Sequence, residues 1–435
     1  MSVVIKGASI LGQKTADVYV EDGVIREIGV STGSTSGSDH SASEVIEADG
    51  LVLLPGLVDL HTHLREPGRE DAETVLTGSQ AAAAGGFTSV LAMANTNPVT
   101  DTAEAAERVL DLGREAGLVD VQPVGAVTKG LAGEELAELG LMARSRARVR
   151  VFSDDGKCVG DARVMRRALE YVKAFGGIIS QHSQDPSLAP HASCCHEGPI
   201  SGDLGLPGWP GVAEDVIVAR DVMLARHTGS RVHVAHVSTA GSVEVIRWAK
   251  SQAKKDGTWE VTAEVTPHHL LLTTDLLRGY DPTYKVNPPL RPAEDVEALR
   301  AALADGTIDA VATDHAPHAR HDKEHAFVDA AFGMLGLETA LSVVGTVMVE
   351  SGLLDWAGVA RVMSTAPAAI AGLTGHGREI AVGEPANLAL VDPSADYVVD
   401  RDDSLSLARN NPWHGRTLTG RVVGTWLRGK RTFGA

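Results

Sequence analysis

Hydrophobic and polar positions follow two different rhythms along the chain. In the first 50 residues, short apolar stretches at 3–5, 17–20 and 24–28 predict β-strands, and Glu21-Asp22-Gly23 is a hairpin signal between two of them. From about residue 50, apolar runs alternate with helical stretches. The strand candidates are 52–63, 88–95, 121–127, 148–154, 177–182, 231–238, 260–268 and 308–315. Helical stretches lie between them, for example at 72–84, 102–116, 162–174, 213–226 and 241–253.

Strands that alternate with crossover helices predict a parallel sheet, and eight is the number that closes a barrel. After about residue 378 the first rhythm returns, at 387–391 and 421–427. The simplest arrangement pairs both chain ends in one small β domain beside the barrel. We therefore predict an α/β protein with residues 1–54 and 378–435 in the β domain and 55–377 in a (β/α)8 barrel. Residues 31–43, rich in Ser and Gly, are expected to form an exposed loop that contains His40.

The composition narrows the possible partners. The net charge of −18 argues against a nucleic-acid or anionic-membrane partner, because no basic surplus exists to meet phosphates. No apolar run is long enough to span a bilayer, and the first residues lack the pattern of a signal peptide. The three cysteines, Cys158, Cys194 and Cys195, do not suggest a disulfide framework. We expect a cytoplasmic protein that acts on a small molecule.

Metal-binding residue types collect at the predicted strand ends. His61 and His63, two apart on the first barrel strand, point to the same face and can reach one point in space. Other candidate strands end in Ser153-Asp154-Asp155, Gln181-His182, Ala235-His236 and Thr313-Asp314-His315. Because the active site of such a barrel lies at the carboxyl ends of its strands, we expect these side chains to meet at one rim. Asp59 shares the face of the two histidines, and we expect it to contact a histidine ring.

Four histidines and two aspartates are more than one tetrahedral ion needs, which predicts a two-metal site with a bridging carboxylate. Nitrogen and oxygen ligands without a thiolate cage suit zinc, although manganese or cobalt also fit. A water held by two cations loses its proton near neutral pH and becomes a nucleophile. Asp314 is placed to accept that proton and hand it to a leaving nitrogen, which predicts hydrolysis of an amide. Arg65, two residues beyond His63, offers a bidentate fork for a substrate carboxylate.

Seven motifs extend this pattern over almost the whole chain. In order they are His61-Thr62-His63-Leu64-Arg65-Glu66-Pro67-Gly68, Ala94-Asn95-Thr96-Asn97-Pro98, Phe152-Ser153-Asp154-Asp155-Gly156, Ala235-His236-Val237-Ser238-Thr239, Lys285-Val286-Asn287-Pro288-Pro289-Leu290-Arg291, Asp314-His315-Ala316-Pro317-His318 and Phe332-Gly333-Met334-Leu335-Gly336-Leu337-Glu338-Thr339. Together they resemble the bacterial class I dihydroorotases, cyclic amidohydrolases of the amidohydrolase superfamily. The resemblance implies a distorted (β/α)8 TIM barrel with a small β-sandwich domain. It also implies zinc-dependent, reversible conversion of (S)-dihydroorotate to N-carbamoyl-L-aspartate in de novo pyrimidine (UMP) biosynthesis, with a metal-bridged hydroxide as nucleophile.

The resemblance implies a role for each matched residue. The first metal ion would be held by His61, His63 and Asp314, the second by His182 and His236, and an aspartate at the end of strand four, Asp155 by its spacing to His182, would bridge them. Asp314 would also be the general acid/base. The substrate contacts would come from His63, Arg65, Asn95, Asn287, His318, Phe332 and Gly333, with Arg65, Asn95 and His318 on the carboxylate.

Three points stay open on the sequence. Asp154 and Asp155 point to opposite faces of a strand, so only one can bridge, and Asp155 is favoured. His233 competes with His236, which is nearer the strand end and matches the motif. Lys157 raises the alternative of a carbamylated lysine, although it falls beyond the turn glycine.

Partners and rival functions follow from the same resemblance. We expect a homodimer and consider a complex with aspartate transcarbamoylase. One rival is another cyclic amidohydrolase, an allantoinase or a hydantoinase, which shares the first strand motif. The other is an inactive dihydroorotase-like subunit that supports aspartate transcarbamoylase, but such chains lose metal ligands that are all present here. Pro67-Gly68 and residues 193–209 are candidate lid loops at the rim.

Overall fold

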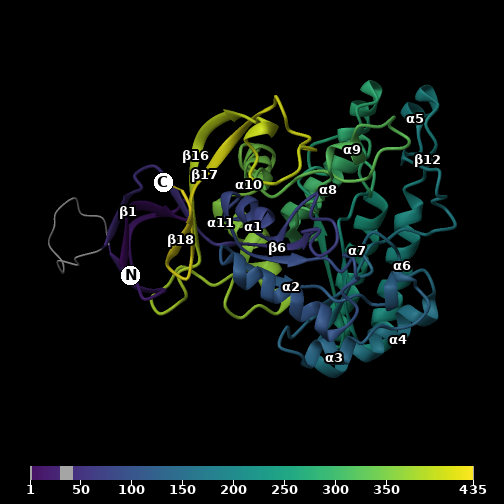
Figure 1. Cartoon of the computed structure of the whole chain (residues 1–435), viewed down its shortest axis with the longest axis horizontal. Coiled ribbons are helices and arrows are strands. Elements are labelled where there is room, and N and C mark those ends of the chain that lie inside the picture. The colour runs from purple at the N-terminus through teal and green to yellow at the C-terminus, as the bar shows by residue number, and fades with distance from the viewer. Residues whose placement is uncertain (1, 30–42, 435) are drawn as a thin grey trace.

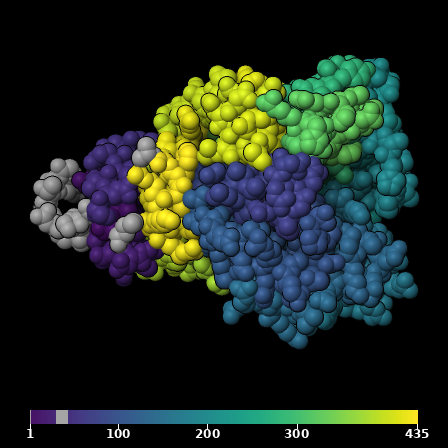
Figure 2. All heavy atoms as spheres, in the orientation of Figure 1, coloured from purple at the N-terminus to yellow at the C-terminus, as the bar shows by residue number. Residues whose placement is uncertain are grey.

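The computed structural model describes residues 2–29 and 43–434. Most of the predicted loop at 31–43, with His40, lies outside the described residues. Figure 1 shows a small β domain that carries both ends of the chain, beside a larger body of strands and helices. In the space-filling view of Figure 2, the N-terminal strands in purple lie against the C-terminal strands in yellow. Within the two described ranges, no helix is both long and apolar enough to cross a membrane.

The small β domain is an eight-stranded sheet in the order β18-β17-β16-β5-β1-β2-β3, with β4 paired to β1. Its strands are β1 (Ser2–Ile10), β2 (Lys14–Glu21), β3 (Val24–Gly29), β4 (Glu44–Glu47), β5 (Val52–Pro55), β16 (Leu388–Val398), β17 (Thr417–Leu427) and β18 (Lys430–Phe433). The antiparallel pairing of β5 with β16 sets Leu53 opposite Leu390 and so joins the two ends of the chain. The predicted hairpin is present, with Asp22 (φ 51°) and Gly23 (φ 80°) as its two left-handed turn residues.

Eight parallel strands form the barrel, as predicted. They are β6 (Leu57–Thr62), β7 (Phe87–Ala92), β8 (Asp120–Pro123), β9 (Val151–Phe152), β10 (Ile178–Gln181), β13 (Arg231–Val234), β14 (Glu260–Val265) and β15 (Ala310–Val311). They pair as two ladders, β6-β7-β8 and β9-β10-β13-β14-β15. Single bridges between Gly125 and Phe152 and between Thr62 and His315 connect the ladders at the two seams. The barrel is therefore distorted, with two weakly paired seams.

Helices cover the outside of the barrel. The longer ones are α1 (Val75–Ala84), α2 (Ala103–Ala116), α4 (Ala162–Val172), α6 (Val212–Thr228), α7 (Ala240–Asp256) and α8 (Ala293–Asp305). Local signals set their ends: the side chains of Thr102 and Thr239 cap the N-termini of α2 and α7, and Gly117 and Gly257 end these helices in the left-handed conformation. The inward faces supply a continuous apolar core against the strands. These helices bring each chain segment back to the same end of the barrel, so that the strand ends gather at one rim.

Short elements complete the described chain. They are α3 (Leu139–Arg144), α5 (Pro199–Leu204), α9 (Arg320–Lys323), α10 (Ala340–Val344), α11 (Trp356–Ala360), α12 (Ala366–Ala371), β11 (Cys195–His196), β12 (Gly208–Trp209), the π-helical turns η5 (Gly345–Val349) and η6 (Arg361–Thr365), and the 3-10 turns η1 (Lys129–Leu131), η2 (Lys173–Phe175), η3 (Thr274–Gly279), η4 (Pro282–Tyr284) and η7 (Arg401–Asp403). The segment 193–209, predicted as a candidate lid loop, thus consists of the paired strands β11 and β12 with α5 between them. Cys194 and Cys195 lie buried there as free thiols, packed against Leu277 and Phe327.

The single strand predicted at 52–63 is wrong, because the chain breaks at Gly56 into β5 of the small domain and β6 of the barrel. A Cβ at Gly56 would lie 2.4 Å from the Thr88 side chain, so only glycine allows the chain to pass β7 this closely. Several other predicted strands extend too far at their carboxyl ends. The residues beyond those ends turn out of the ladder and carry the side chains described next.

Candidate metal centre

The six side chains predicted as metal ligands meet at the carboxyl ends of the barrel strands. His61 lies in β6, and the other five follow a strand end by one to three residues: His63 after β6, Asp155 after β9, His182 after β10, His236 after β13 and Asp314 after β15. All six are buried. The sequence prediction that strand ends would bring these residues together is therefore matched by their positions.

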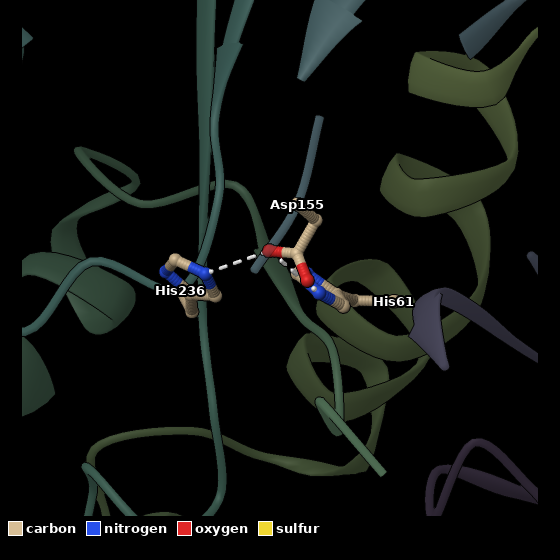
Figure 3. Close-up of side chains that lie close together, drawn as sticks. All are labelled: His61, Asp155 and His236. Carbon is tan, nitrogen blue, oxygen red and sulfur yellow. Dashed lines mark hydrogen bonds and ion pairs between the residues drawn. The ribbon is translucent and has the colours of Figure 1, made fainter. Parts of the chain in front are cut away.

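Asp155 lies at the centre of the cluster (Figure 3). Its Oδ1 is 3.3 Å from His61 Nε2, 3.2 Å from His236 Nε2 and 3.4 Å from His182 Nδ1. Its Oδ2 is 3.3 Å from His63 Nε2. One carboxylate thus faces four imidazole rings, with an oxygen toward each side. This is the position that a bridging ligand between two cations must occupy.

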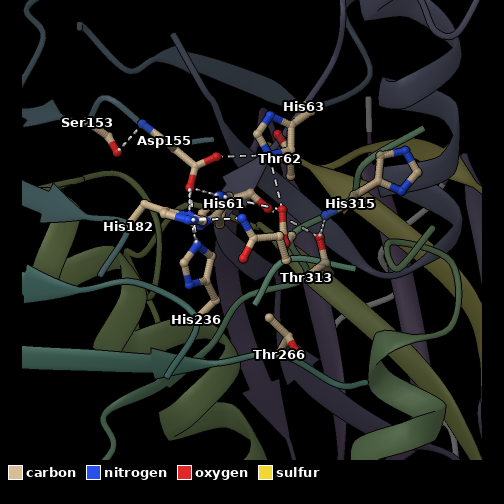
Figure 4. A network of polar contacts seen from close by, with 12 residues as sticks. His61, Thr62, His63, Ser153, Asp155, His182, His236, Thr266, Thr313 and His315 are labelled. Carbon is tan, nitrogen blue, oxygen red and sulfur yellow. Dashed lines mark hydrogen bonds and ion pairs between the residues drawn. The ribbon is translucent and has the colours of Figure 1, made fainter. Parts of the chain in front are cut away.

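Asp314 lies on the side of His61 and His63. Figure 4 shows the histidine rings of the cluster gathered around Asp155. Asp314 Oδ1 is 3.0 Å from His63 Nε2 and 3.6 Å from His61 Nε2. The ligand atoms of His61, His63 and Asp314 lie within 4.8 Å of one another, and so do those of His61, Asp155 and His236. The two groups overlap at His61. They define two adjacent places where a cation could be held.

His182 extends the second group, because its Nδ1 is 2.9 Å from His236 Nε2. Both ring nitrogens face the same oxygen of Asp155. They are therefore placed to bind one cation together. The other ring nitrogen of His182 lies 3.2 Å from the side-chain oxygen of Gln184. The ring is therefore held from outside the cluster.

The structure distinguishes between the alternatives that the sequence left open. Asp154 points away from the cluster and accepts hydrogen bonds from the backbone N–H groups of Val127 (2.8 Å) and Thr128 (2.9 Å). His233 lies 3.0 Å from Glu264 and belongs to a supporting network. Lys157 is exposed at the turn beyond Asp155. Asp155 and His236 are thus the members of each pair that reach the cluster.

The histidine rings of the cluster stabilise the charged form of Asp155 and of Asp314. Burial opposes ionisation of Asp155, but the His61 ring and the hydrogen bonds of His182 and His236 hold its pKa well below the usual range. Burial also opposes ionisation of Asp314, and the rings of His61 and His63 lower its pKa below the usual range. Both carboxylates are therefore charged near neutral pH, which is the state that binds a cation.

The residues fit a pair of divalent cations. Within the described part of the chain, the buried Nε2 of His61 has no hydrogen-bond partner, although it faces two carboxylates. A buried polar atom without a partner is rare and needs an explanation. Imidazole and carboxylate donors are the set that zinc accepts in catalytic sites. His61 belongs to both groups of ligands, and a bound cation would give its Nε2 the partner that it lacks.

The backbone at this rim is strained. His236 (φ 31°), Asp314 (φ 47°) and Arg65 (φ 61°) all adopt the left-handed conformation, which costs a non-glycine residue about 1–2 kcal/mol. Each lies where the chain leaves its strand. The unusual backbone turns these side chains out of the strand register and toward the cluster. Such outliers concentrate at functional sites, where the surrounding fold sustains them.

Glu264, on β14, is a site residue that the sequence reasoning missed. Its Oε1 lies 2.9 Å from His61 Nδ1, and its Oε2 lies 3.0 Å from His233 Nε2. Although burial opposes its charge, the hydrogen bonds of His233 and His61 lower its pKa to about 2. The carboxylate therefore accepts the Nδ1 proton of His61 and leaves Nε2 free for the cluster. The available signal was a glutamate within the otherwise uncharged strand segment Val261 to Val265.

Asp59 does not contact a histidine ring, so that expectation is wrong. Its Oδ1 accepts hydrogen bonds from the backbone N–H groups of His61 and Thr313, both at 3.0 Å. Burial raises its pKa to about 6. Asp59 thus ties the first barrel strand to the eighth, at the seam where the Thr62–His315 bridge lies. It fixes the backbone that carries the ligands.

Arg65 and His318 lie together beside the cluster. Arg65 Nε donates to the carbonyl of Pro317 at 3.0 Å, and its Nη2 is 3.4 Å from His318 Nε2. Burial lowers the pKa of Arg65 to about 10, so the guanidinium stays charged at neutral pH. Among the described residues, no carboxylate lies within the 4.0 Å ion-pair distance of it. A partly buried cation without a counter-ion is suited to an anionic group of a ligand.

The two predicted asparagines contact metal-ligand histidines. The side-chain oxygen of Asn95 is 2.9 Å from His63 Nδ1, and its amide donates to the backbone carbonyl of Asp155 at 3.4 Å. Asn287 Nδ2 is 3.3 Å from His182 Nε2, while its buried oxygen has no partner among the described atoms. Asn95 thus supports two ligands. The free oxygen of Asn287 is available to a donor on a ligand.

The Phe332-Gly333 segment closes the other side of the site. The carbonyl of Phe332 accepts from His318 at 2.7 Å, and its ring lies 4.4 Å from Lys285 Nζ. Lys323, which the sequence reasoning missed, donates to the carbonyl oxygens of Lys285 (3.2 Å), Ala331 (2.8 Å) and Gly333 (3.0 Å). The buried side-chain nitrogen of Lys323 therefore holds this backbone in place.

A cavity of about 830 Å³ opens onto the cluster. His182 and Asn287 line it on the side of the candidate metals, and Trp209 and Phe332 line it on the side of the rim. The two aromatic rings lie with their centres 6.0 Å apart. The volume suits a small organic substrate. The segment 193–209, which carries Trp209, thus forms part of the wall.

The sequence is similar to known proteins along nearly its whole length. The family model described as dihydro-orotase-like matches residues 50–242. The chain is 61% identical to the dihydroorotase of Streptomyces coelicolor, over 98% of this chain and 97% of that one. It is 59% identical to the dihydroorotase of Leifsonia xyli subsp. xyli, over 99% and 95% of the two chains. It is 55% identical to that of Mycobacterium tuberculosis, over 99% and 98%.

Solved structures share the fold over the whole chain. The dihydropyrimidinase from Brevibacillus agri has a TM-score of 0.84 at 23% identity, over 99% of this chain and 95% of that one. The L-hydantoinase from Arthrobacter aurescens has a TM-score of 0.84 at 26% identity, over 100% and 98%. The predicted α/β class, a TIM barrel with a β-sandwich domain formed from both chain ends, is confirmed.

Proposed function

We propose that this chain, which belongs to the dihydroorotase family, catalyses the reversible hydrolysis of (S)-dihydroorotate to N-carbamoyl-L-aspartate. The observation that carries the proposal is the pairing of a buried four-histidine, two-aspartate cluster with Arg65, which makes no ion pair with any described residue. The cluster suits hydrolysis of a cyclic amide, and Arg65 suits the carboxylate that distinguishes dihydroorotate from an uncharged ring. The identity of 55–61% to dihydroorotases over nearly the full chain supports the same conclusion.

His61, His63 and Asp314 would hold one cation, His182 and His236 the other, and Asp155 would bridge them. We propose that both ions are zinc. Bound there, they would supply an activated water and polarise the amide carbonyl. This assignment rests on the distances around Asp155 and on the unpaired Nε2 of His61.

Asp314 is the group that moves the proton. Its carboxylate is ionised near neutral pH and lies at the edge of the cluster, 3.0 Å from His63 Nε2. In the hydrolytic direction it accepts a proton from the attacking water and delivers it to the ring nitrogen that leaves. In the reverse direction it removes the proton from the carbamoyl nitrogen. One carboxylate therefore serves both directions.

The remaining residues orient the substrate. Arg65, Asn95 and His318 hold its carboxylate, and Arg65 supplies the charge. The imidazole of His63 lies between Asp155 and Asp314. It would contact the part of the substrate ring that reacts. Asn287 and the backbone of Phe332-Gly333 contact the ring amides, with Lys323 keeping that backbone in position. Trp209 and Phe332 line the cavity that the ring would enter.

A substrate panel tests this proposal. We expect the zinc-loaded protein to hydrolyse dihydroorotate and to leave hydantoin, allantoin and dihydrouracil essentially unchanged. Turnover of any of the other rings, with no turnover of dihydroorotate, would assign the chain to a hydantoinase-type or allantoinase activity instead. Binding of zinc without turnover of any ring would favour the inactive supporting subunit.

We further propose a cytoplasmic homodimer. A complex with aspartate transcarbamoylase stays a prediction. Light scattering of the purified protein tests the dimer, and co-elution with aspartate transcarbamoylase tests the complex. The domain limits at 54/55 and 377/378 are likewise proposals. Limited proteolysis near those positions tests them.

A further inference from the structure

A second cavity, of about 450 Å³, lies at the opposite end of the barrel from the candidate metals. Its walls include Asp120, the first residue of β8, and Arg150 and Val151 at the start of β9, whereas the metal ligands follow the carboxyl ends of the strands. Residues 371–376 and Arg428, which follows β17 of the small domain, complete it. It shares no lining residue with the cavity at the metal cluster. A ligand here would contact both the barrel and the β domain, and such boundaries are common ligand sites.

The cavity carries positive charge in an acidic chain. Its lining holds three arginines, Arg148, Arg150 and Arg428, and one carboxylate, Asp120. That carboxylate is already paired, because it accepts two hydrogen bonds from Arg428 (2.6 and 3.0 Å) and lies 2.8 Å from His376 Nε2. Within the described residues, neither Arg148 nor Arg150 makes an ion pair. Two uncompensated guanidinium groups therefore line one cavity of a chain with net charge −18.

The Arg150 guanidinium is held by the surrounding backbone before any ligand arrives. Nη1 of Arg150 donates to the backbone carbonyls of Ala143, Arg148 and Val149 at 2.9, 3.3 and 2.9 Å. Arg148 and Arg428 both have φ of 48°, in the left-handed region that costs a non-glycine residue about 1–2 kcal/mol. The other strained arginine of the described chain is Arg65, at the candidate active site. Arginines with a strained backbone therefore occur both at the candidate active site and at this cavity. Such backbone strain is typical of functional sites.

We propose that this cavity binds a small phosphorylated metabolite, with the phosphoryl group on Arg148 and Arg150. A phosphate monoester carries a charge of about −1.5 to −2 at pH 7, which matches the two unpaired guanidinium groups. Arginine forks pair bidentately with such an oxyanion. The apolar side chains of Leu91, Val151 and Leu373 line the rest of the cavity and suit a compact organic body. The volume lies within the range of small-molecule sites, about 300–1,000 Å³.

The test is calorimetric titration of the zinc-loaded full chain with ribose 5-phosphate, inorganic phosphate and succinate as separate probes. We expect ribose 5-phosphate to bind, inorganic phosphate to bind more weakly because it lacks the organic body, and succinate to bind least. Saturation with ribose 5-phosphate, at about 100-fold excess over its dissociation constant, should raise the melting temperature by about 2–4 °C. No binding at millimolar concentration, or equal binding of succinate, would overturn the proposal.

Substitutions at Arg148, with a control at Arg144, locate the binding. Arg148→Gln should weaken ribose 5-phosphate binding at least about tenfold, as expected for loss of one charged hydrogen-bonding fork. Arg144→Gln is the matched control, because Arg144 is an exposed arginine four residues earlier that does not line the cavity. Should Arg148→Gln fail to fold, Arg148→Gly removes the guanidinium and accommodates the φ of 48°. Unchanged binding in the Arg148 variants would place the ligand elsewhere, such as the metal centre, and would contradict the proposal.

Discussion

Glu264→Gln is the substitution that tests most sharply how the metal centre is positioned. The carboxylate of Glu264 accepts from two rings at once, His61 Nδ1 at 2.9 Å and His233 Nε2 at 3.0 Å. Glutamine has the same shape but only one acceptor atom, and its amide group donates. One of the two rings must therefore lose its hydrogen bond or change its tautomer. If His61 takes the other tautomer, the proton moves to Nε2, the atom that faces Asp155 and Asp314.

The size of the effect follows from the hydrogen bond that is lost. A hydrogen bond to a charged group contributes about 1.5–3 kcal/mol, which corresponds to roughly 10–150-fold in an equilibrium constant. Loss of a carboxylate behind a metal-binding histidine typically weakens metal binding about 10–100-fold. We therefore expect zinc affinity to fall by one to two orders of magnitude in Glu264→Gln. Turnover at saturating zinc should recover much of the wild-type value, because no group that contacts substrate has changed.

Competition with a chromogenic chelator measures the zinc dissociation constant of each variant. Glu260→Gln is the matched control, since it makes the same substitution on the same strand at an exposed position, where Glu260 pairs with Arg231 at 2.6 Å. The control should bind zinc like the wild type. If Glu264→Gln also binds zinc within about twofold of the wild type, the carboxylate does not set the state of His61 and this reasoning is refuted.

Three further predictions follow from the same geometry. Asp314→Asn should lower kcat by at least about 10²-fold through loss of the proton acceptor, with zinc partly retained; near-normal turnover would remove the role assigned to Asp314. Arg65→Ala should raise KM for dihydroorotate about 10–150-fold and affect kcat less, and an unchanged KM would place the substrate carboxylate elsewhere. Asp120→Asn should lower the melting temperature at pH 7, because His376 and Arg428 hold the pKa of Asp120 below its usual range even though burial opposes its ionisation. That stabilisation is fully present above the unfolded-state pKa near 4 and is lost progressively as pH falls from there through the folded-state pKa. The difference in melting temperature between the two proteins should therefore shrink steadily below about pH 4, and a constant difference would contradict the prediction.

The sequence was sufficient for the parts of the site that depend on local periodicity. His61 and His63 are two residues apart on a strand, and the ends of the other strands followed from the alternation of apolar and helical stretches. Strand geometry left Asp154 and Asp155 open, and Asp155 was favoured by the resemblance to the dihydroorotases. The structure shows the physical basis, since Asp154 is held by the backbone of Val127 and Thr128 on the other side of the strand.

Contacts between residues far apart in the sequence could not be predicted from local periodicity. Glu264 lies 203 residues from His61, and no local pattern says which histidine a buried carboxylate will meet. Asp59 was expected to contact a histidine ring, but its partners proved to be the backbone N–H groups of His61 and, across the seam, Thr313. Strand lengths were overestimated, because pairing with neighbouring strands ends β9 and β15 after two residues. In each case a partner far along the chain sets the outcome.

The most direct test of the two-metal account is a titration of the metal-free protein with zinc, with dihydroorotate hydrolysis and bound zinc measured in the same samples. The account predicts no turnover without metal and a rise in activity that ends at two zinc ions per chain. Full activity in the metal-free protein, or a plateau in both activity and binding at one ion, would contradict a centre in which Asp155 bridges two cations.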